Sequence, residues 1–131
     1  MKRKYAQVRP ETIDDLAAIL GKDGISTKKS DLENYASDEM PFPKPNLAQV
    51  IAKPADSAAV SRLLAYANKN RIPVTPRGAG TGLSGGCIPI HGGILLSLER
   101  MNRIIQINRK NFTATVEPAV TLDNLHTAVE E

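Results

Sequence analysis

The sequence is poor in aromatic residues and almost free of cysteine. Only 4% of its 131 residues are aromatic and none is tryptophan, so the core must be built from aliphatic side chains. Cys87 is the single cysteine, which excludes a disulfide framework and an all-cysteine metal site, and we expect no bound metal. No apolar run approaches the roughly 20 residues that a membrane-spanning helix needs, so we expect no transmembrane segment.

The N-terminus and the charge balance argue against two further classes of protein. Residues 1–4 are basic, but polar and acidic residues follow them, so we expect no signal peptide and a cytoplasmic location. The net charge of +3 comes from 17 Lys and Arg against 14 Asp and Glu, which are interspersed. With few aromatic side chains to stack on bases, the sequence predicts no nucleic-acid partner. The remaining composition is typical of one globular domain with a modest core.

Two segments in the first half of the chain carry apolar residues at helical spacing. In the first, residues 12–20, Thr12 is the predicted N-cap and Gly21 the left-handed stop. In the second, Asp56 is the predicted N-cap and Asn70 the left-handed terminator. Both helices therefore have start and stop signals.

A third helix is predicted after Thr121, and its apolar stripe still continues at Glu131. Because no Gly or Pro ends it, we expect the chain to be the N-terminal piece of a longer protein. Residues 22–46 show no clear period and are expected to be irregular. Within them, three prolines in residues 41–45 predict an extended surface run.

Five aliphatic runs predict strands. Three of them, residues 47–52, 72–75 and 94–98, are short and largely apolar. The other two, residues 104–107 and 112–117, are separated by a four-residue polar link that suits a hairpin. The last run alternates with period two, which predicts one buried and one solvated face. The predicted fold class is α/β (α+β), a small mixed or parallel sheet flanked by helices and followed by an antiparallel hairpin.

The most informative segment is rich in glycine and has no charged side chain. Residues 78–98 contain no Asp, Glu, Lys or Arg, and they hold seven of the nine glycines. Glycine tolerates positive φ and allows close approach to the backbone, so successive amides can form a concave anion site. The hydroxyls of Thr81 and Ser84 and the charge of Arg77 can add to such a site. The expected guest is a phosphate or a pyrophosphate.

Two common nucleotide-binding motifs do not explain this loop. A Walker A loop needs Lys and then Ser or Thr after its last glycine, whereas Gly85-Gly86-Cys87 stands here. Glycines 80, 82 and 85 match the spacing of the Rossmann fingerprint, and Glu99 lies where a ribose-binding acid would. Only residues 87–93 separate the loop from the next strand, however, and they are too few for the helix that this fingerprint must open.

A family resemblance accounts for the loop and its flanks together. The loop reads Pro76-Arg77-Gly78-x-Gly80-Thr81-x-x-Ser84-Gly85-Gly86 after Ile72-Pro73-Val74, and it resembles the pyrophosphate loop of FAD-linked oxidases. The flanking motifs that also resemble this family are Tyr35-x-x-Asp38, Val50-x-x-Lys53-Pro54, residues 93–98 before Met101-Asn102, and Val116-Glu117-Pro118-x-Val120. The family is the vanillyl-alcohol-oxidase/PCMH-type flavoprotein superfamily, and the resemblance is greatest to its glycolate oxidase and D-lactate dehydrogenase branch.

The resemblance implies an FAD-binding domain of two α/β subdomains with the cofactor between them. Residues 1–30 would be a helical lead-in, residues 47–100 the pyrophosphate-binding subdomain, and residues 101–131 the start of the second subdomain. The implied cofactor-binding residues are Pro76, Arg77, Gly78, Ala79, Gly80, Thr81, Gly82, Ser84 and Gly85.

Two positions bear on how the cofactor is held. Covalent members of the superfamily carry a His where this sequence has Thr81, so FAD is expected to be noncovalent. Ala119 stands where the family commonly has Gly. The remaining single residues (Cys87, His91, His126, Tyr35, Asp38) are expected to be structural, while Asn102 is equally suited to binding the cofactor and to capping a turn.

The implied activity is the oxidation of a small 2-hydroxy acid of the glycolate or D-lactate type, with hydride transfer to flavin N5. Other oxidase subunits or an electron acceptor would be further partners, and the catalytic residues would lie beyond position 131. Two alternatives stay open at this point. One is a non-redox module that holds a nucleotide or phosphate in the same loop, and the other is a fragment that folds without binding FAD.

Overall fold

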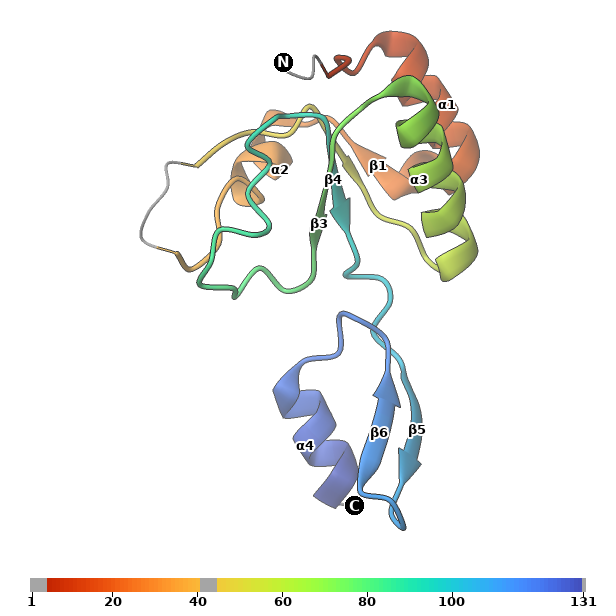
Figure 1. Cartoon of the computed structure of the whole chain (residues 1–131), viewed down its shortest axis with the longest axis vertical. Coiled ribbons are helices and arrows are strands. Elements are labelled where there is room, and N and C mark those ends of the chain that lie inside the picture. The colour runs from red at the N-terminus through yellow and green to blue at the C-terminus, as the bar shows by residue number, and fades with distance from the viewer. Residues whose placement is uncertain (1–4, 41–44, 131) are drawn as a thin grey trace.

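The computed structural model describes residues 5–40 and 45–130 (Figure 1). Most of the extended run predicted for residues 41–45 lies outside the described residues. The helices are α1 (Pro10–Leu20), α2 (Lys29–Asn34), α3 (Ser57–Asn70) and α4 (Leu122–Glu130), with a 3-10 turn at Lys22–Gly24. The strands are β1 (Ile25–Ser26), β2 (Val50–Ala52), β3 (Val74–Arg77), β4 (Ile94–Ser97), β5 (Ile104–Asn108) and β6 (Thr113–Val116).

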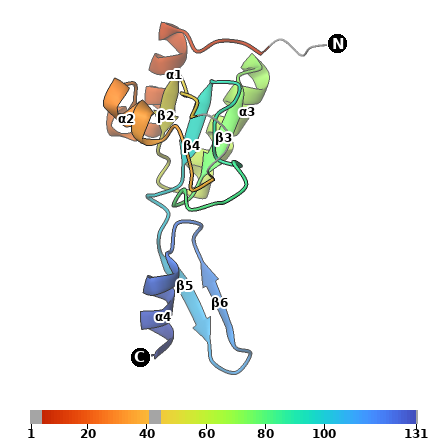
Figure 2. The same ribbon diagram turned by 90° about the vertical axis from the view of Figure 1, so that its left-hand side faces the viewer.

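The strands form two separate sheets. The first has the order β1-β2-β4-β3, in which β2, β4 and β3 are parallel and β1 is antiparallel to β2. The second is the antiparallel hairpin β5-β6. Figures 1 and 2 both show the hairpin and α4 as a second unit, joined to the first through the chain that leaves β4. This arrangement confirms the predicted α/β fold class.

Alternating side chains along β2 and β4 build a core on each face of the first sheet. The larger core faces α1 and α3 and contains Leu16, Val50, Ala52, Leu63, Ala67, Ile72, Ile94 and Leu96. Ile51 and Leu95 point to the other face, where Leu32 of α2 packs against them. Because helices cover both faces, these strands are apolar except for Ser97 at the end of β4.

The start of α1 differs from the prediction. Pro10 occupies the first turn, where a missing N–H does no harm. The N-cap position falls at Arg9, so the prediction of Thr12 as N-cap is wrong. Thr12 is buried in the first turn, where its hydroxyl accepts a hydrogen bond from the Arg9 amide at 3.2 Å. Gly21 ends the helix with φ of 80°, which confirms the predicted stop.

The ends of α3 confirm one prediction and correct another. Asp56 is the N-cap, and its Oδ1 accepts a hydrogen bond from the Ala59 amide at 2.7 Å. The left-handed residue at the other end is Arg71, with φ of 55°, and not Asn70. Asn70 is the last helical residue, and its side-chain amide donates to the carbonyl oxygen of Tyr66.

Residues 22–46 are more regular than predicted, because the 3-10 turn, β1 and α2 lie within them. β1 pairs with β2 through Ile25 opposite Ala52. A strand of two residues shows no period in the sequence, so its partner across the sheet defines it. The apolar strands are also shifted from their predicted bounds, since β2 begins at Val50 and β3 extends to Arg77.

The hairpin and α4 form as predicted, with one difference. Thr121 Oγ1 accepts a hydrogen bond from the Asn124 amide at 3.3 Å, which confirms the predicted cap of α4. The expected buried face of β6 is not found, because all four residues of that strand are exposed. A groove of about 490 Å³ between the hairpin and α4 is lined by residues that include Ile107, Phe112 and Val129. No helix within the described ranges is long and apolar enough to cross a membrane.

Candidate functional site

The glycine-rich loop begins at the carboxyl ends of three parallel strands. β3 ends at Arg77, and residues 78–93 return the chain to the start of β4. Ligands of open α/β sheets bind outside the carboxyl ends of the strands. The turn after β6 adjoins the same edge, since a Cβ built on Gly78 would lie 3.5 Å from the carbonyl oxygen of Pro118. The start of the loop therefore lies at the junction of the two units, and the rest of it runs along the first unit beside α2 (Figure 1).

The main-chain amides in the first part of this loop, residues 78–86, are not used by the fold. No amide in residues 78–86 donates a hydrogen bond to any part of the chain that the structure describes. The first amide after them to do so is that of Ile88, which donates to the carbonyl oxygen of Gly85. Gly80 and Gly85 have φ of 78° and 71°, which only glycine adopts without strain. Free amides along a glycine-rich turn are the donors that an anion requires.

The nine predicted site residues lie in one run but differ in exposure. Pro76 and Arg77 end β3. The exposed members of the loop are Gly78, Ala79, Thr81, Gly82 and Ser84, while Gly80 and Gly85 are half-buried. The hydroxyls of Thr81 and Ser84 are thus accessible beside the free amides. The binding role of these residues stays a prediction.

Arg77 does not present its charge freely. Its Nη1 donates to the carbonyl oxygen of Ser37 at 2.6 Å and to Sγ of Cys87 at 3.4 Å. The guanidinium carbon lies 5.3 Å from the centroid of the Tyr35 ring. A Cβ built on Gly80 would overlap this guanidinium. The side chain that the sequence assigned to the anion is therefore engaged with the turn that follows α2.

Tyr35, expected to be structural, connects this turn to the strand ends. Its hydroxyl donates to the carboxylate of Glu99, which follows β4. Lys53, which follows β2, has Nζ 2.8 Å from Glu99 Oε1 and 5.2 Å from the Tyr35 ring centroid. Ser97 donates to the same carboxylate at 2.9 Å. This polar cluster, Tyr35, Lys53, Ser97 and Glu99, lies at the carboxyl ends of β2 and β4.

The polar cluster contains an ion pair at neutral pH. Burial alone would raise the pKa of Glu99, but hydrogen bonds from Lys53, Tyr35 and Ser97 outweigh it and hold this pKa below 4.5. Burial would lower the pKa of Lys53, but the interactions with Glu99 and Tyr35 raise this pKa above 10.5. The sequence did not predict this cluster, because Lys53 and Glu99 are far apart in the chain and come together only in the folded structure.

The other single residues near the loop make structural contacts. The Cys87 thiol is half-buried and lies 3.8 Å from Oδ2 of Asp38, whose carboxylate also accepts a hydrogen bond from the Met40 amide. His91 stacks on Tyr5 with 4.9 Å between ring centroids. Among residues 5–40 and 45–130, no group of three His, Cys, Asp or Glu side chains could hold a metal.

The turn after β6 is fixed by Glu117, which is only 7% exposed. Its carboxylate accepts hydrogen bonds from the Arg103 guanidinium at 2.7 and 3.1 Å and from the Arg103 amide at 2.8 Å. These bonds hold the pKa of Glu117 below 4.5. The Ala119 amide donates to the carbonyl oxygen of Met101 at 2.9 Å. The fold therefore already uses the amide at the position where the family commonly has Gly.

Comparison with known proteins identifies relatives of the whole chain. The profile of the FAD binding domain family matches residues 48–131. The D-lactate dehydrogenase of Anaerostipes hadrus is 33% identical over 122 residues, which are 93% of this chain and 26% of that protein. Glycolate oxidase subunit GlcD of Bacillus subtilis is 32% identical over 117 residues, 89% of this chain and 25% of that protein. The chain thus spans about a quarter of the length of these relatives.

A solved structure shares the fold of this chain. The crystal structure of p-cresol methylhydroxylase matches with a TM-score of 0.79 and 23% identity, over 92% of this chain and 24% of that one. This likeness confirms the PCMH-type fold that the motifs implied. Since the family profile covers well over half of the sequence and the loop leaves a run of amides free to bind an anion, the residues present fit the cofactor of that family. The chain belongs to the FAD binding domain family, and its cofactor is FAD.

Proposed function

We propose that the glycine-rich loop binds the diphosphate of FAD through its main-chain amides, in a flavin-dependent oxidoreductase that oxidises a 2-hydroxy acid of the glycolate or D-lactate type. The observation that carries this proposal is the run of uncommitted amides in residues 78–86, placed at the carboxyl ends of parallel strands. The names of the two relatives support the substrate class. When bound, the flavin supplies the redox chemistry by accepting hydride at N5.

The residues of this chain hold and orient the diphosphate. Amides of residues 78–82 donate to its oxygens, and the hydroxyls of Thr81 and Ser84 add two donors. Glycine at 78 and 82 keeps the backbone accessible to the ligand. In this arrangement residues 47–100 are the pyrophosphate-binding subdomain and residues 101–131 the start of the second subdomain, after a lead-in over residues 1–30.

FAD is held noncovalently in this proposal. Thr81 stands where covalent members carry His, and a hydroxyl on that side chain cannot form the link that an imidazole forms. The measurement is direct, because acid precipitation of the holoprotein releases noncovalent flavin into the supernatant. Flavin that stays with the precipitated protein would show a covalent bond.

The proposal extends to the partners of the protein and to its cellular location. The substrate is a small molecule, and other oxidase subunits or an electron acceptor take the electrons onward. A cytoplasmic location and the absence of a nucleic-acid partner also remain predictions of the sequence. The non-redox alternative, a phosphate-binding module, uses the same free amides and differs in the colour of the purified protein.

The test uses the complete protein that carries this chain. The wild type is expected to be yellow, and D-lactate or glycolate should bleach its visible absorption in the absence of oxygen. Gly82→Val is the variant for the loop, because among the described residues a Cβ there would meet Asp38 Oδ2 alone, at the ordinary contact distance of 3.8 Å. We expect it to lose FAD at an unchanged unfolding temperature of the apoprotein.

The control is Ala65→Val, on the exposed side of α3, which should keep both flavin and stability. A colourless wild type that still binds phosphate would favour the non-redox module. A Gly82→Val variant that retains flavin at full affinity would contradict the assignment of the loop.

A further inference from the structure

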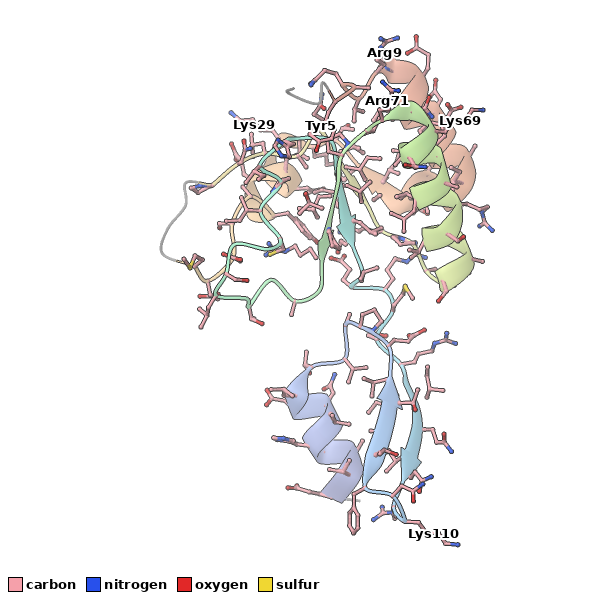
Figure 3. All side chains as sticks on the ribbon, viewed as in Figure 1. Tyr5, Arg9, Lys29, Lys69, Arg71 and Lys110 are labelled. Atoms are coloured by element: carbon pink, nitrogen blue, oxygen red, sulfur yellow. The ribbon has the colours of Figure 1, made fainter. Side chains whose placement is uncertain are left out.

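Arg77 is the cation that the sequence places next to the free amides. Residues 78–98 contain no Lys or Arg, so a diphosphate in the loop has no other positive side chain from that segment. Figure 3 shows Arg9, Lys69 and Arg71 at the far end of the first unit, away from the loop. The simplest expectation is that the Arg77 guanidinium neutralises the diphosphate. Its contacts indicate a different role.

The guanidinium is fixed on the protein side of the loop by three kinds of contact. Nη1 reaches the Ser37 carbonyl oxygen and the Cys87 thiol, and the guanidinium lies near the Tyr35 ring. The same group fills the space in which a side chain on Gly80 would begin. Arg77 thus supports the loop at Gly80, a left-handed residue with φ of 78°.

The Tyr35 ring is itself held in place. Its hydroxyl is bound to Glu99, and Lys53 pairs with the same carboxylate while lying 5.2 Å from the ring. Two cations therefore approach one ring, and Glu99 neutralises one of them. A continuous set of contacts leads from the ends of β2 and β4, through the ring, to the guanidinium beneath Gly80.

We propose that Arg77 is a positioning residue, which shapes the loop through Gly80 and does not neutralise the diphosphate. This inference rests on the proposed function of the loop. In this arrangement Tyr35, Ser37 and Cys87 hold the Arg77 guanidinium against Gly80. The charged diphosphate is bound by main-chain amides and hydroxyls. Gly80 is then required by the guanidinium, whereas Gly82 is required by the ligand.

The two roles differ in how FAD affinity depends on salt and on Tyr35. A guanidinium that contacts a phosphate makes the affinity fall with ionic strength, and removing it lessens that dependence. A guanidinium that only positions the loop leaves the dependence unchanged when it is removed. Its effect on affinity also requires Tyr35, so the two substitutions should not add.

The experiment measures the dissociation constant of FAD from the complete apoprotein by flavin fluorescence, over a range of sodium chloride concentrations. Arg77→Gln and Tyr35→Leu should each weaken binding by about tenfold or more, which is the effect of losing a charge-assisted contact. The dissociation constant of FAD from the double variant should be no larger than that from the single variant that binds FAD less tightly. The slope of FAD affinity against sodium chloride concentration should be the same in the wild type, the two single variants and the double variant.

Conservative variants separate positioning from a general loss of structure. Tyr35→Phe keeps the ring beneath the guanidinium and should bind FAD within about twofold to threefold of wild type. Arg77→Lys should not restore binding, because one ammonium cannot reproduce the flat guanidinium between Ser37, Cys87 and the ring. Arg62→Gln, an exposed position on α3, is the charge-matched control and should bind as wild type does.

Either of two outcomes with Arg77→Gln overturns the inference. A smaller salt slope in Arg77→Gln, together with unchanged affinity in Tyr35→Leu, would show that Arg77 contacts the diphosphate directly. Full additivity of the two substitutions would show that Arg77 acts independently of the ring. If Arg77→Gln does not fold, the Tyr35→Leu and Tyr35→Phe pair decides by itself, since equal affinities in that pair would contradict the proposal. A wild-type protein that binds no FAD would instead contradict the proposed function.

Discussion

The guanidinium of Arg77 occupies the position at which a side chain on Gly80 would start. Gly80 also has a φ of 78°, a conformation that L-residues avoid. Two independent constraints thus require glycine at this position. At Gly82, by contrast, a Cβ would make one ordinary contact within residues 5–40 and 45–130, with Asp38 Oδ2 at 3.8 Å.

Gly80→Ala should therefore destabilise the apoprotein, while Gly82→Ala should not. The backbone strain at residue 80 alone costs about 1–2 kcal/mol, and displacement of the guanidinium adds to it. Thermal unfolding in the absence of FAD measures both variants. Equal unfolding temperatures for the two would contradict both constraints, since neither the backbone conformation of residue 80 nor the guanidinium beside it would then disfavour a side chain.

Leu63 and Leu64 offer a matched pair for the main core. Leu63 on α3 is fully buried against β2 and β4, whereas its neighbour Leu64 is 43% exposed. Leu63→Ala should lower the free energy of unfolding by about 2–5 kcal/mol through lost burial and a residual cavity. Leu64→Ala should lower it by much less, and denaturant titration of both variants measures the difference. Similar losses would mean that α3 does not pack as described.

Elements with their own periodicity could be predicted from the sequence. The strands β2 and β4 and the helix α3 follow from the sequence, because a strand buried on both faces is a nearly continuous apolar run and apolar residues of a helix repeat at i, i+3 and i+4. Asp56 was found because an N-cap acts within one turn of its own helix. These features depend on neighbours in the sequence, so the sequence alone contains them.

Elements defined by distant partners could not be predicted. β1 exists because Ile25 pairs with Ala52, and no local pattern marks a strand of two residues. At the end of α3, Arg71 takes the left-handed conformation because the next residue, Ile72, must turn into the core, where it is 6% exposed. The preference of Asn for the left-handed conformation contributes less free energy than the burial of an isoleucine side chain.

The candidate site also combines a feature that local sequence determines with contacts that depend on distant residues. The glycine-rich loop is evident from composition, and the anion site that we expect there stays a prediction. The partners of Arg77 could not be predicted from the sequence, because Ser37 and Tyr35 lie about 40 residues earlier in the chain. Residue type alone suggested a phosphate contact, and only the fold shows which groups surround the guanidinium.

Glu117 should give the protein a stability component that acid removes. Hydrogen bonds from Arg103 lower the pKa of this carboxyl in the folded state below its unfolded value of 4.5. Below pH 4.5 the unfolded chain then binds more protons than the folded one, so this component is complete above pH 4.5 and is lost as pH falls through the folded pKa. The stability difference between wild type and Glu117→Gln should therefore be largest near neutral pH and shrink in acid.

Chemical denaturation over a series of pH values measures this difference. Glu33→Gln, at an exposed pair on α2, is the control and should show a small difference that varies little with pH. A difference for Glu117→Gln that stays constant into acid would mean that the contacts with Arg103 do not stabilise the charged carboxyl.

Phe112 combines an unfavourable backbone with an unburied side chain. It has φ of 53°, and its side chain is 95% exposed at the edge of the groove between the hairpin and α4. Asn tolerates the left-handed region better than Phe and adds no apolar surface. Phe112→Asn should therefore leave the stability of the 131-residue chain equal or slightly higher.

The same variant should also reduce the binding of a hydrophobic dye, because exposed apolar patches attract such probes. Dye fluorescence with the 131-residue chain measures this, and the expected result is a clear decrease relative to wild type. Ile90→Ser is the control, since Ile90 is exposed but belongs to the glycine-rich loop and not to the groove. If Ile90→Ser lowers the fluorescence and Phe112→Asn does not, the dye binds at the loop, and the groove is not the main apolar surface of this chain.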